Sequence, residues 1–169
     1  MTFARLKAAL AVLFILSLPL AATSAESADA HAADSTAVQK LFVDFNRLFN
    51  DHEAQAASKL FVDDADFIVV GGNTIHGAAQ IEQHLQPLFA GRLKTVHREV
   101  VLRGIRFLRP DTATVDSDYV TSGIPGANGG EMPPVKGLYD WIVMKHNGQW
   151  RIVVWHESNL PVPAVPPTR

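Results

Sequence analysis

The sequence contains no cysteine, and this absence removes several kinds of protein chemistry at once. Disulfide bonds, thiolate nucleophiles and the lipid anchor of a lipoprotein all require a cysteine side chain. The folded chain must therefore be held together by its hydrophobic core alone.

Charge is also sparse. Charged residues make up 19% of the 169 residues, the formal net charge is -2, and no basic stripe is visible. A nucleic-acid-binding surface needs clustered lysine and arginine, so nucleic acid is not expected as a partner. The 47% of apolar residues is a globular composition, and the length suits one domain with a single core.

Long hydrophobic runs are absent too. The apolar run from Ala8 to Leu20 is shorter than the roughly 20 residues that a membrane-spanning helix needs. It follows the basic residues Arg5 and Lys7 and precedes small residues that end at Ala25. This order is typical of a secretory signal peptide, residues 1–25. We expect cleavage after Ala25 and a periplasmic or secreted chain without a stable membrane span; the alternative is an uncleaved N-terminal anchor.

No motif for a metal or a cofactor is present. The seven histidines never fall in the H-x-H or H-E-x-x-H spacing, and neither a dinucleotide-binding fingerprint nor a G-x-S-x-G nucleophile motif occurs. We therefore expect no metal site and no bound cofactor.

Helical patterns come first in the chain. Residues 26–34 are unpatterned, and we expect them to be a disordered lead. Apolar residues then recur in steps of three and four over residues 35–50, which predicts a helix with a phenylalanine-rich stripe. Further helices are predicted over residues 53–61 and 78–89.

Strand patterns dominate the second half. Gly104 is a predicted bulge that bends the longest strand, and Asn147-Gly148 is a strong hairpin turn signal. The proline-rich tail, residues 161–169, is expected to be extended. The predicted strands cover residues 66–70, 74–76, 95–108, 113–123, 137–146 and 149–157.

The order of the elements predicts an α+β fold, because helices precede long antiparallel strands. A curved antiparallel sheet would wrap around the N-terminal helices as a cone over residues 35–160. The glycine- and proline-rich segment from Ile124 to Lys136 is long for a hairpin connection. It is either a lid over a pocket or an ordinary surface loop.

Five short motifs occur in an order that resembles the SgcJ/EcaC group of SnoaL-like proteins. This group belongs to the nuclear transport factor 2-like superfamily, which also holds ketosteroid isomerases. The resemblance covers about residues 36–160 and implies a cystatin-like fold, a deep pocket and usually a homodimer through the outer face of the sheet. The motifs are NRLFNDH at 46–52, LFVDDADF at 60–67, HGAAQI at 76–81, FLRPDTA at 107–113 and NGQWRI at 147–152.

The isomerase comparison can be made residue by residue. The position of the catalytic base falls on Val69 and that of the oxyanion-binding tyrosine on Phe45, neither of which can carry a proton. The position of the protonated aspartate falls on Asp140. Steroid-type isomerisation is therefore not expected.

Two residues are candidates for catalysis. Strand alternation places Asp140 on one face with Leu138, Ile142 and Met144, and an apolar row should raise the pKa of a carboxyl group. Asp140 is thus a candidate general acid or base, although a structural aspartate paired with an arginine has the same pattern. The hydroxyl of Tyr119 is the second candidate, and core packing is its alternative.

The predicted pocket takes a small apolar or ring-containing molecule. The family's pattern in the last strand suggests that Trp155 faces the pocket, while plain core packing is the alternative. The expected lining residues are Phe45, Phe49, Val69, Phe89, Trp155 and Glu157.

The face opposite Asp140 carries Tyr139, Trp141 and Val143. An aromatic outer face favours an interface, so we expect a homodimer to form there.

Two functions remain open at this point. The chain is either an exported small-molecule-binding protein without a catalytic set, or a small-molecule enzyme of cyclase, isomerase or hydrolase type that uses Asp140.

Overall fold

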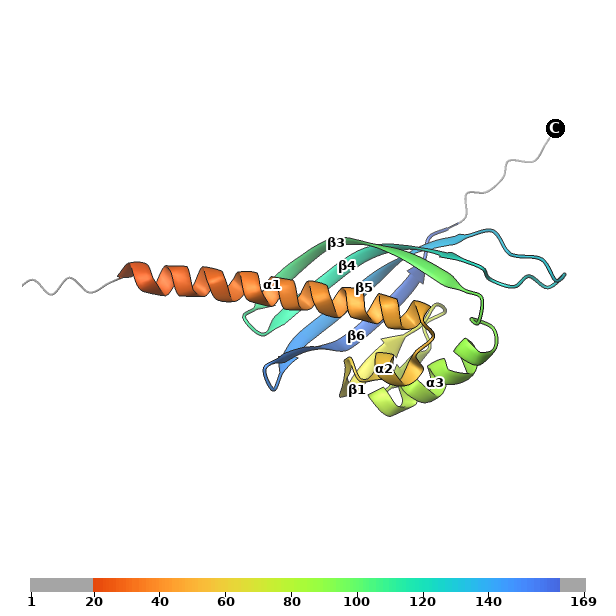
Figure 1. The fold of residues 1–169 in the computed structure, drawn as a ribbon, viewed down its shortest axis with the longest axis horizontal. Helices are drawn as coiled ribbons and strands as arrows, with labels where there is room; N and C mark the ends of the chain where they lie inside the picture. The colour runs from red at the N-terminus through yellow and green to blue at the C-terminus, as the bar shows by residue number, and fades with distance from the viewer. Residues whose placement is uncertain (1–19, 162–169) are drawn as a thin grey trace, which may run out of the picture.

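The protein, seen in a computed structural model that describes residues 20–161, has its helices before most of its strands (Figure 1). The helices are α1 (Leu20–Asn50), α2 (Ala54–Ser58) and α3 (Ala78–Ala90). None of the described helices is long and apolar enough to cross a membrane. The strands are β1 (Phe61–Ile68), β2 (Thr74–His76), β3 (His97–Arg109), β4 (Thr112–Ser122), β5 (Val135–His146) and β6 (Gln149–Asn159).

The six strands form one curved, open sheet in the order β2-β1-β6-β5-β4-β3. Neighbouring strands are antiparallel except β1 and β6, which run parallel, so the prediction of an antiparallel sheet is corrected to a mixed one. Parallel neighbours need a long connection, and here α3 and three long strands separate the two. The predicted features in the long strands are confirmed: the β3–β4 register shifts at Gly104, and Asn147 and Gly148 turn with positive φ.

Helix α1 lies across the concave face of the sheet and supplies one side of the core (Figure 1). Phe45 is fully buried and contacts the rings of Phe61, Trp141 and Trp155. Trp155 also stacks on Phe67, with ring centroids 4.2 Å apart. Interlocking aromatic rings thus fill the core over the centre of the sheet. Removing one such side chain lowers the stability of a folded protein by about 3–5 kcal/mol.

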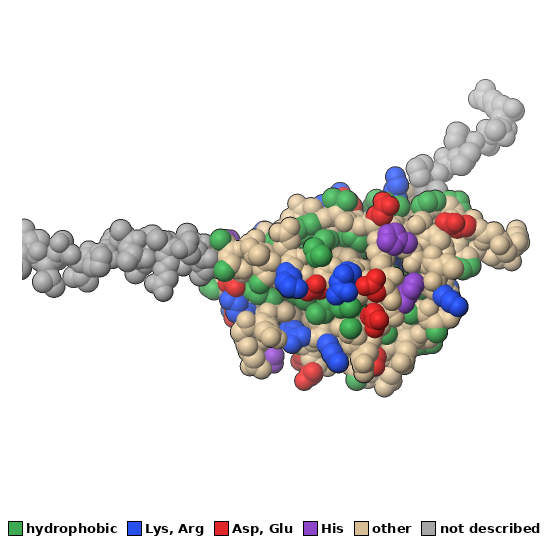
Figure 2. Space-filling view, viewed as in Figure 1, with side chains coloured by type: hydrophobic (Ala, Val, Ile, Leu, Met, Phe, Trp, Pro, Cys, Tyr) green, Lys and Arg blue, Asp and Glu red, His purple; other side chains and the backbone are tan. Residues whose placement is uncertain are grey.

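The opposite side of α1 faces solvent and carries i,i+4 ion pairs. Lys40 pairs with Asp44 and Arg47 pairs with Asp51, so both signs of charge mix on this face (Figure 2). The helical spacing of these pairs adds a few tenths of a kcal/mol each.

The start of α1 differs from the prediction. Residues 26–34, expected to be a disordered lead, belong to the helix. Alanine has the highest helix propensity, and this segment is rich in it. The last residues of this segment are also tied to the sheet, since His31 contacts the ring of Phe107 and Asp34 bonds to both Lys145 and Trp150. The predicted signal sequence up to residue 19 and tail residues 162–169 lie outside the described residues.

The two faces of β5 are also the reverse of the prediction. Tyr139, Trp141 and Val143 are almost completely buried against α1 and cannot form an outer interface. Asp140 is exposed on the outer face, with Ile142 beside it. The alternation was predictable but its direction was not, because β5 carries apolar side chains on both faces.

Candidate functional site

The inner face of the sheet changes from apolar to polar towards the end where α3 and the β4–β5 loop lie. The central cross-strand row, Val115, Trp141, Trp155 and Phe67, is hydrophobic, and its polar side-chain atoms are the two indole nitrogens. Every following row contains side chains that can hydrogen-bond. These rows are Ser117, Tyr139 and Glu157, then Tyr119, Gly137 and Asn159, and finally Arg98 and Thr121.

A cavity of about 450 Å³ opens at this polar end, and we call it the end cavity. Its volume lies within the range of small-molecule sites. Arg98, Tyr119, Glu157 and Asn159 supply polar groups, and His84 and Arg92 stand on the α3 side. The apolar part of its wall consists of Val69, Val70, Leu88, Leu93, Ile124, Met132 and Val135.

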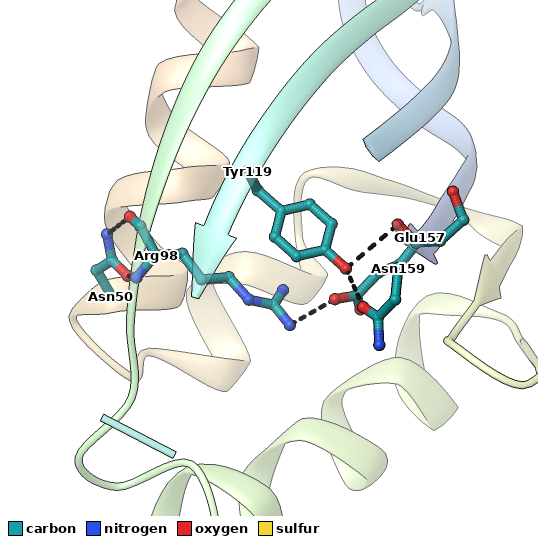
Figure 3. Close-up of polar contacts among 6 residues, drawn as sticks. Asn50, Arg98, Tyr119, Glu157 and Asn159 are labelled. Carbon is teal, nitrogen blue, oxygen red and sulfur yellow. Dashed lines mark hydrogen bonds and ion pairs between the residues drawn. The ribbon is translucent and has the colours of Figure 1, made fainter. Parts of the chain in front are cut away.

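Arg98 and Glu157 form a buried ion pair at the cavity (Figure 3). Arg98 Nη2 lies 2.8 Å from Glu157 Oε1, and each side chain is 10% exposed. The guanidinium group also lies over the ring of Phe49, with its carbon 4.0 Å from the ring centroid. Asn50, the last residue of α1, exchanges two hydrogen bonds with the backbone of Arg98. This strand end is therefore held against the helix, and the arginine is fixed in place.

Tyr119 is held in the same polar region. Its hydroxyl donates to Asn159 Oδ1 at 2.5 Å, and its ring stacks on Tyr139 with centroids 4.4 Å apart. Burial raises the pKa of Tyr119 well above its ordinary value, and the neighbouring Glu157 carboxylate raises it further. The phenol is therefore a neutral hydrogen-bond donor at physiological pH.

A second, wider hollow lies between the start of α3 and the β5–β6 hairpin, with a volume of about 900 Å³. Most of its charged side chains, among them Lys59, Asp63, Asp64 and Lys145, are exposed to solvent. Solvated charges of both signs do not favour a ligand of any one charge or chemical class. The end cavity is thus the better candidate site.

The β4–β5 loop borders the end cavity through Ile124 and Met132. The backbone of Met132 donates to the carbonyl of Ile124, and Glu131 accepts from the backbone of Gly123 at 2.7 Å. The loop therefore forms part of the wall in this conformation. Whether it also moves as a lid stays a prediction.

The structure distributes the predicted site residues over three regions. Tyr119, Val69 and Glu157 line the end cavity. Asp140 is exposed on the outer face of the sheet, opposite Asp116 and His156, and is separated from the cavity by the sheet itself. Phe45, Phe49, Phe89 and Trp155 are buried in the aromatic core and do not line the cavity.

Arg98 is the functional candidate that the sequence reasoning missed. It shares a face with Val100 and Leu102 in β3, and a lone charge in an apolar row is a recognisable signal of a buried pair. Its partner Glu157 comes 59 positions later, so the pairing itself cannot be read from the chain.

Comparison with known protein families gives a match over most of the chain. The SnoaL-like domain profile matches residues 30–156. No curated protein is significantly similar to the chain.

Solved structures with a similar fold include two proteins of unknown function with a cystatin-like fold. The one from Nostoc punctiforme has 19% identity and a TM-score of 0.68, covering 78% of this chain and 80% of that one. The one from Caulobacter vibrioides has 19% identity and a TM-score of 0.69, covering 76% and 91%. A ketosteroid isomerase-like protein from Erwinia carotovora has 16% identity and a TM-score of 0.67, covering 76% and 98%. At these identities the likeness concerns the fold.

Proposed function

Because the chain belongs to the SnoaL-like domain family, we propose that it binds a small molecule in the end cavity. The family includes small-molecule-binding proteins and enzymes of isomerase and dehydratase type. One observation carries the proposal: apolar walls meet the polar groups of Arg98, Tyr119 and Glu157 in a single cavity of suitable size.

The geometry favours binding over turnover. Asp140, the acid–base group of the enzyme hypothesis, is exposed on the other side of the sheet. Of the groups at the end cavity, Glu157 is paired with Arg98 and Tyr119 is held protonated by burial. The cavity therefore offers groups that orient a ligand, and an Asp140-based reaction is not proposed.

The binding proposal is tested with N-phenyl-1-naphthylamine, a neutral probe that fluoresces in apolar sites. We expect the protein to raise its fluorescence, and we expect Val69→Trp, which fills the cavity, to abolish the increase. Val43→Trp is the matched control, because Val43 is 53% exposed on α1. Thermal unfolding shows whether both variants are folded. Undiminished binding by a folded Val69→Trp variant would contradict the proposal.

We further propose that the protein is exported, to the periplasm or beyond the cell. The support is the order of the basic residues, the short apolar run and the small residues before Ala25. N-terminal sequencing of the protein from its native host should find a mature chain that begins at Glu26. A chain that keeps the leader would contradict this cleavage.

Homodimer formation through the outer face of the sheet is a third proposal. Exposed apolar side chains on this face, Val101, Ile142 and Met144, take the place of the three buried residues first predicted there. Light scattering should give twice the mass of one chain, and Ile142→Glu should give the mass of one. A monomeric unmodified protein at micromolar concentration would exclude the dimer.

A further inference from the structure

Buried polar atoms without a hydrogen-bond partner gather at one place in the protein. Nine such side-chain atoms occur in the part of the chain that the structure describes, and five of them belong to the polar rows at or beside the end cavity. Each unpaired buried group costs about 1–3 kcal/mol, so a cluster of them calls for an explanation. The five are Arg98 Nε and Nη1, Ser117 Oγ, Thr121 Oγ1 and Tyr139 Oη.

The cluster has more donors than acceptors. Arginine can only donate, whereas the serine, threonine and tyrosine hydroxyls can do both. Two acceptor oxygens beside them are already engaged, because Glu157 Oε1 accepts from Arg98 and Asn159 Oδ1 accepts from Tyr119. A ligand with acceptor oxygens would therefore match the surplus of donors in this network.

The net charge of the residues that line the end cavity also favours a ligand with acceptor oxygens. Its ionisable lining groups are His84, Arg92, Arg98 and Glu157. Arg98 and Glu157 neutralise each other, while Arg92 is exposed and forms no ion pair with any residue described. The lining is thus net positive, which favours an anion.

We infer that the ligand is an apolar organic acid, and that its carboxylate lies at Arg98 and Thr121 while its apolar body fills the end cavity. These two residues are register partners in β3 and β4, both line the cavity, and both carry unpaired polar atoms. Arg92 at the mouth adds long-range attraction. This inference rests on the proposed binding function and narrows it to one ligand class.

The test compares 1-naphthoate with 1-naphthamide, a neutral molecule of the same shape, by titration calorimetry. We expect the acid to bind about tenfold more tightly or better, because a hydrogen bond to a charged group contributes more than a neutral one. Thr121→Val and Arg92→Gln should each reduce this preference several-fold. Both keep the Arg98–Glu157 pair, so both should fold. Arg103→Gln is the matched control, since Arg103 pairs with Asp118 away from the cavity.

The outcomes separate the two proposals. Equal affinity for the acid and the amide, or an acid preference that Thr121→Val and Arg92→Gln leave unchanged, overturns the acidic-ligand inference. If N-phenyl-1-naphthylamine binds but neither 1-naphthoate nor 1-naphthamide does, the acidic-ligand inference is also overturned. The cavity then remains a binding site for neutral molecules. Failure of all three compounds to bind overturns the binding function itself.

Discussion

The ring of Tyr119 lies directly over Gly137 on the neighbouring strand. A β-carbon at Gly137 would stand 2.2 Å from Tyr119 Cζ and 2.3 Å from the backbone oxygen of Ser158. No side chain other than hydrogen fits at this position of β5 while the tyrosine keeps its place. Glycine at position 137 thus leaves the space that the Tyr119 ring occupies, and this space keeps the Tyr119 hydroxyl in position.

The first prediction concerns this pair. Gly137→Ala should displace Tyr119, break its hydrogen bond to Asn159 and destabilise the protein by about 1–3 kcal/mol. Urea unfolding measures the change. Gly104→Ala is the control, because a β-carbon there meets nothing within 4 Å. Equal stability of the two variants would show that the ring adapts without cost.

The second prediction concerns the titration of tyrosine. The sequence has only two tyrosines, and burial raises the pKa of both Tyr119 and Tyr139. Ultraviolet absorbance of the folded protein at about pH 10, where free tyrosine is half ionised, should show almost no phenolate. Above that pH the unfolded chain releases protons that the folded chain retains, so stability should fall as the pH rises. Phenolate absorbance near pH 10 in folded protein would contradict the burial.

The third prediction concerns the buried ion pair. Arg98→Met or Glu157→Gln alone should cost about 3–5 kcal/mol of stability, because each leaves one buried partner uncompensated. The double variant should lose less than the sum of the two. Chemical unfolding of the three variants measures the coupling. Strict additivity would mean that the two side chains do not interact in solution.

The fourth prediction concerns the attachment of α1 to the sheet. The Lys145 ammonium bonded to Asp34 lowers the pKa of that carboxyl below its usual value, and Trp150 also donates to it. The resulting stability is present above about pH 4 and is lost as the pH falls through the folded-state pKa. Asp34→Asn should remove about 1 kcal/mol at pH 7 and weaken the acid sensitivity. An unchanged acid profile in unfolding experiments would contradict this contribution.

The fifth prediction follows from the position of Asp140. Because this carboxylate is exposed on the outer face, Asp140→Asn should leave ligand binding unchanged and alter stability by no more than about 0.5 kcal/mol. The same calorimetric titration with 1-naphthoate checks it. A large loss of binding would require a path from the outer face to the cavity that the structure does not contain.

Much of the fold was predictable because local signals sufficed. The apolar spacing before Asn50, the bulge at Gly104 and the turn at Asn147-Gly148 each depend on a few adjacent residues. The parallel pairing of β1 with β6 could not be predicted in this way, since it joins segments on either side of five other elements. The helical state of residues 26–34 was missed because their alanines were judged by pattern instead of propensity.

The site was harder to predict because strand faces have no absolute direction. On β5 the apolar Ile142 and the aromatic Trp141 occupy opposite faces, and either could have been the inner one. That ambiguity moved Asp140 into the predicted pocket. The role of Arg98 was missed because it depends on the ion pair with Glu157. Only the folded sheet brings these two residues together.

The outermost position of β3 has a consequence for solubility. A long strand at the border of a sheet offers its backbone to strands of other molecules and can start aggregation. In this protein the bulge at Gly104 interrupts the regular ladder, and Arg103, Arg106 and Arg109 place positive charge along the exposed surface of the strand. Replacing these arginines with apolar residues should therefore shorten the time that concentrated protein stays in solution, even if the end cavity remains intact.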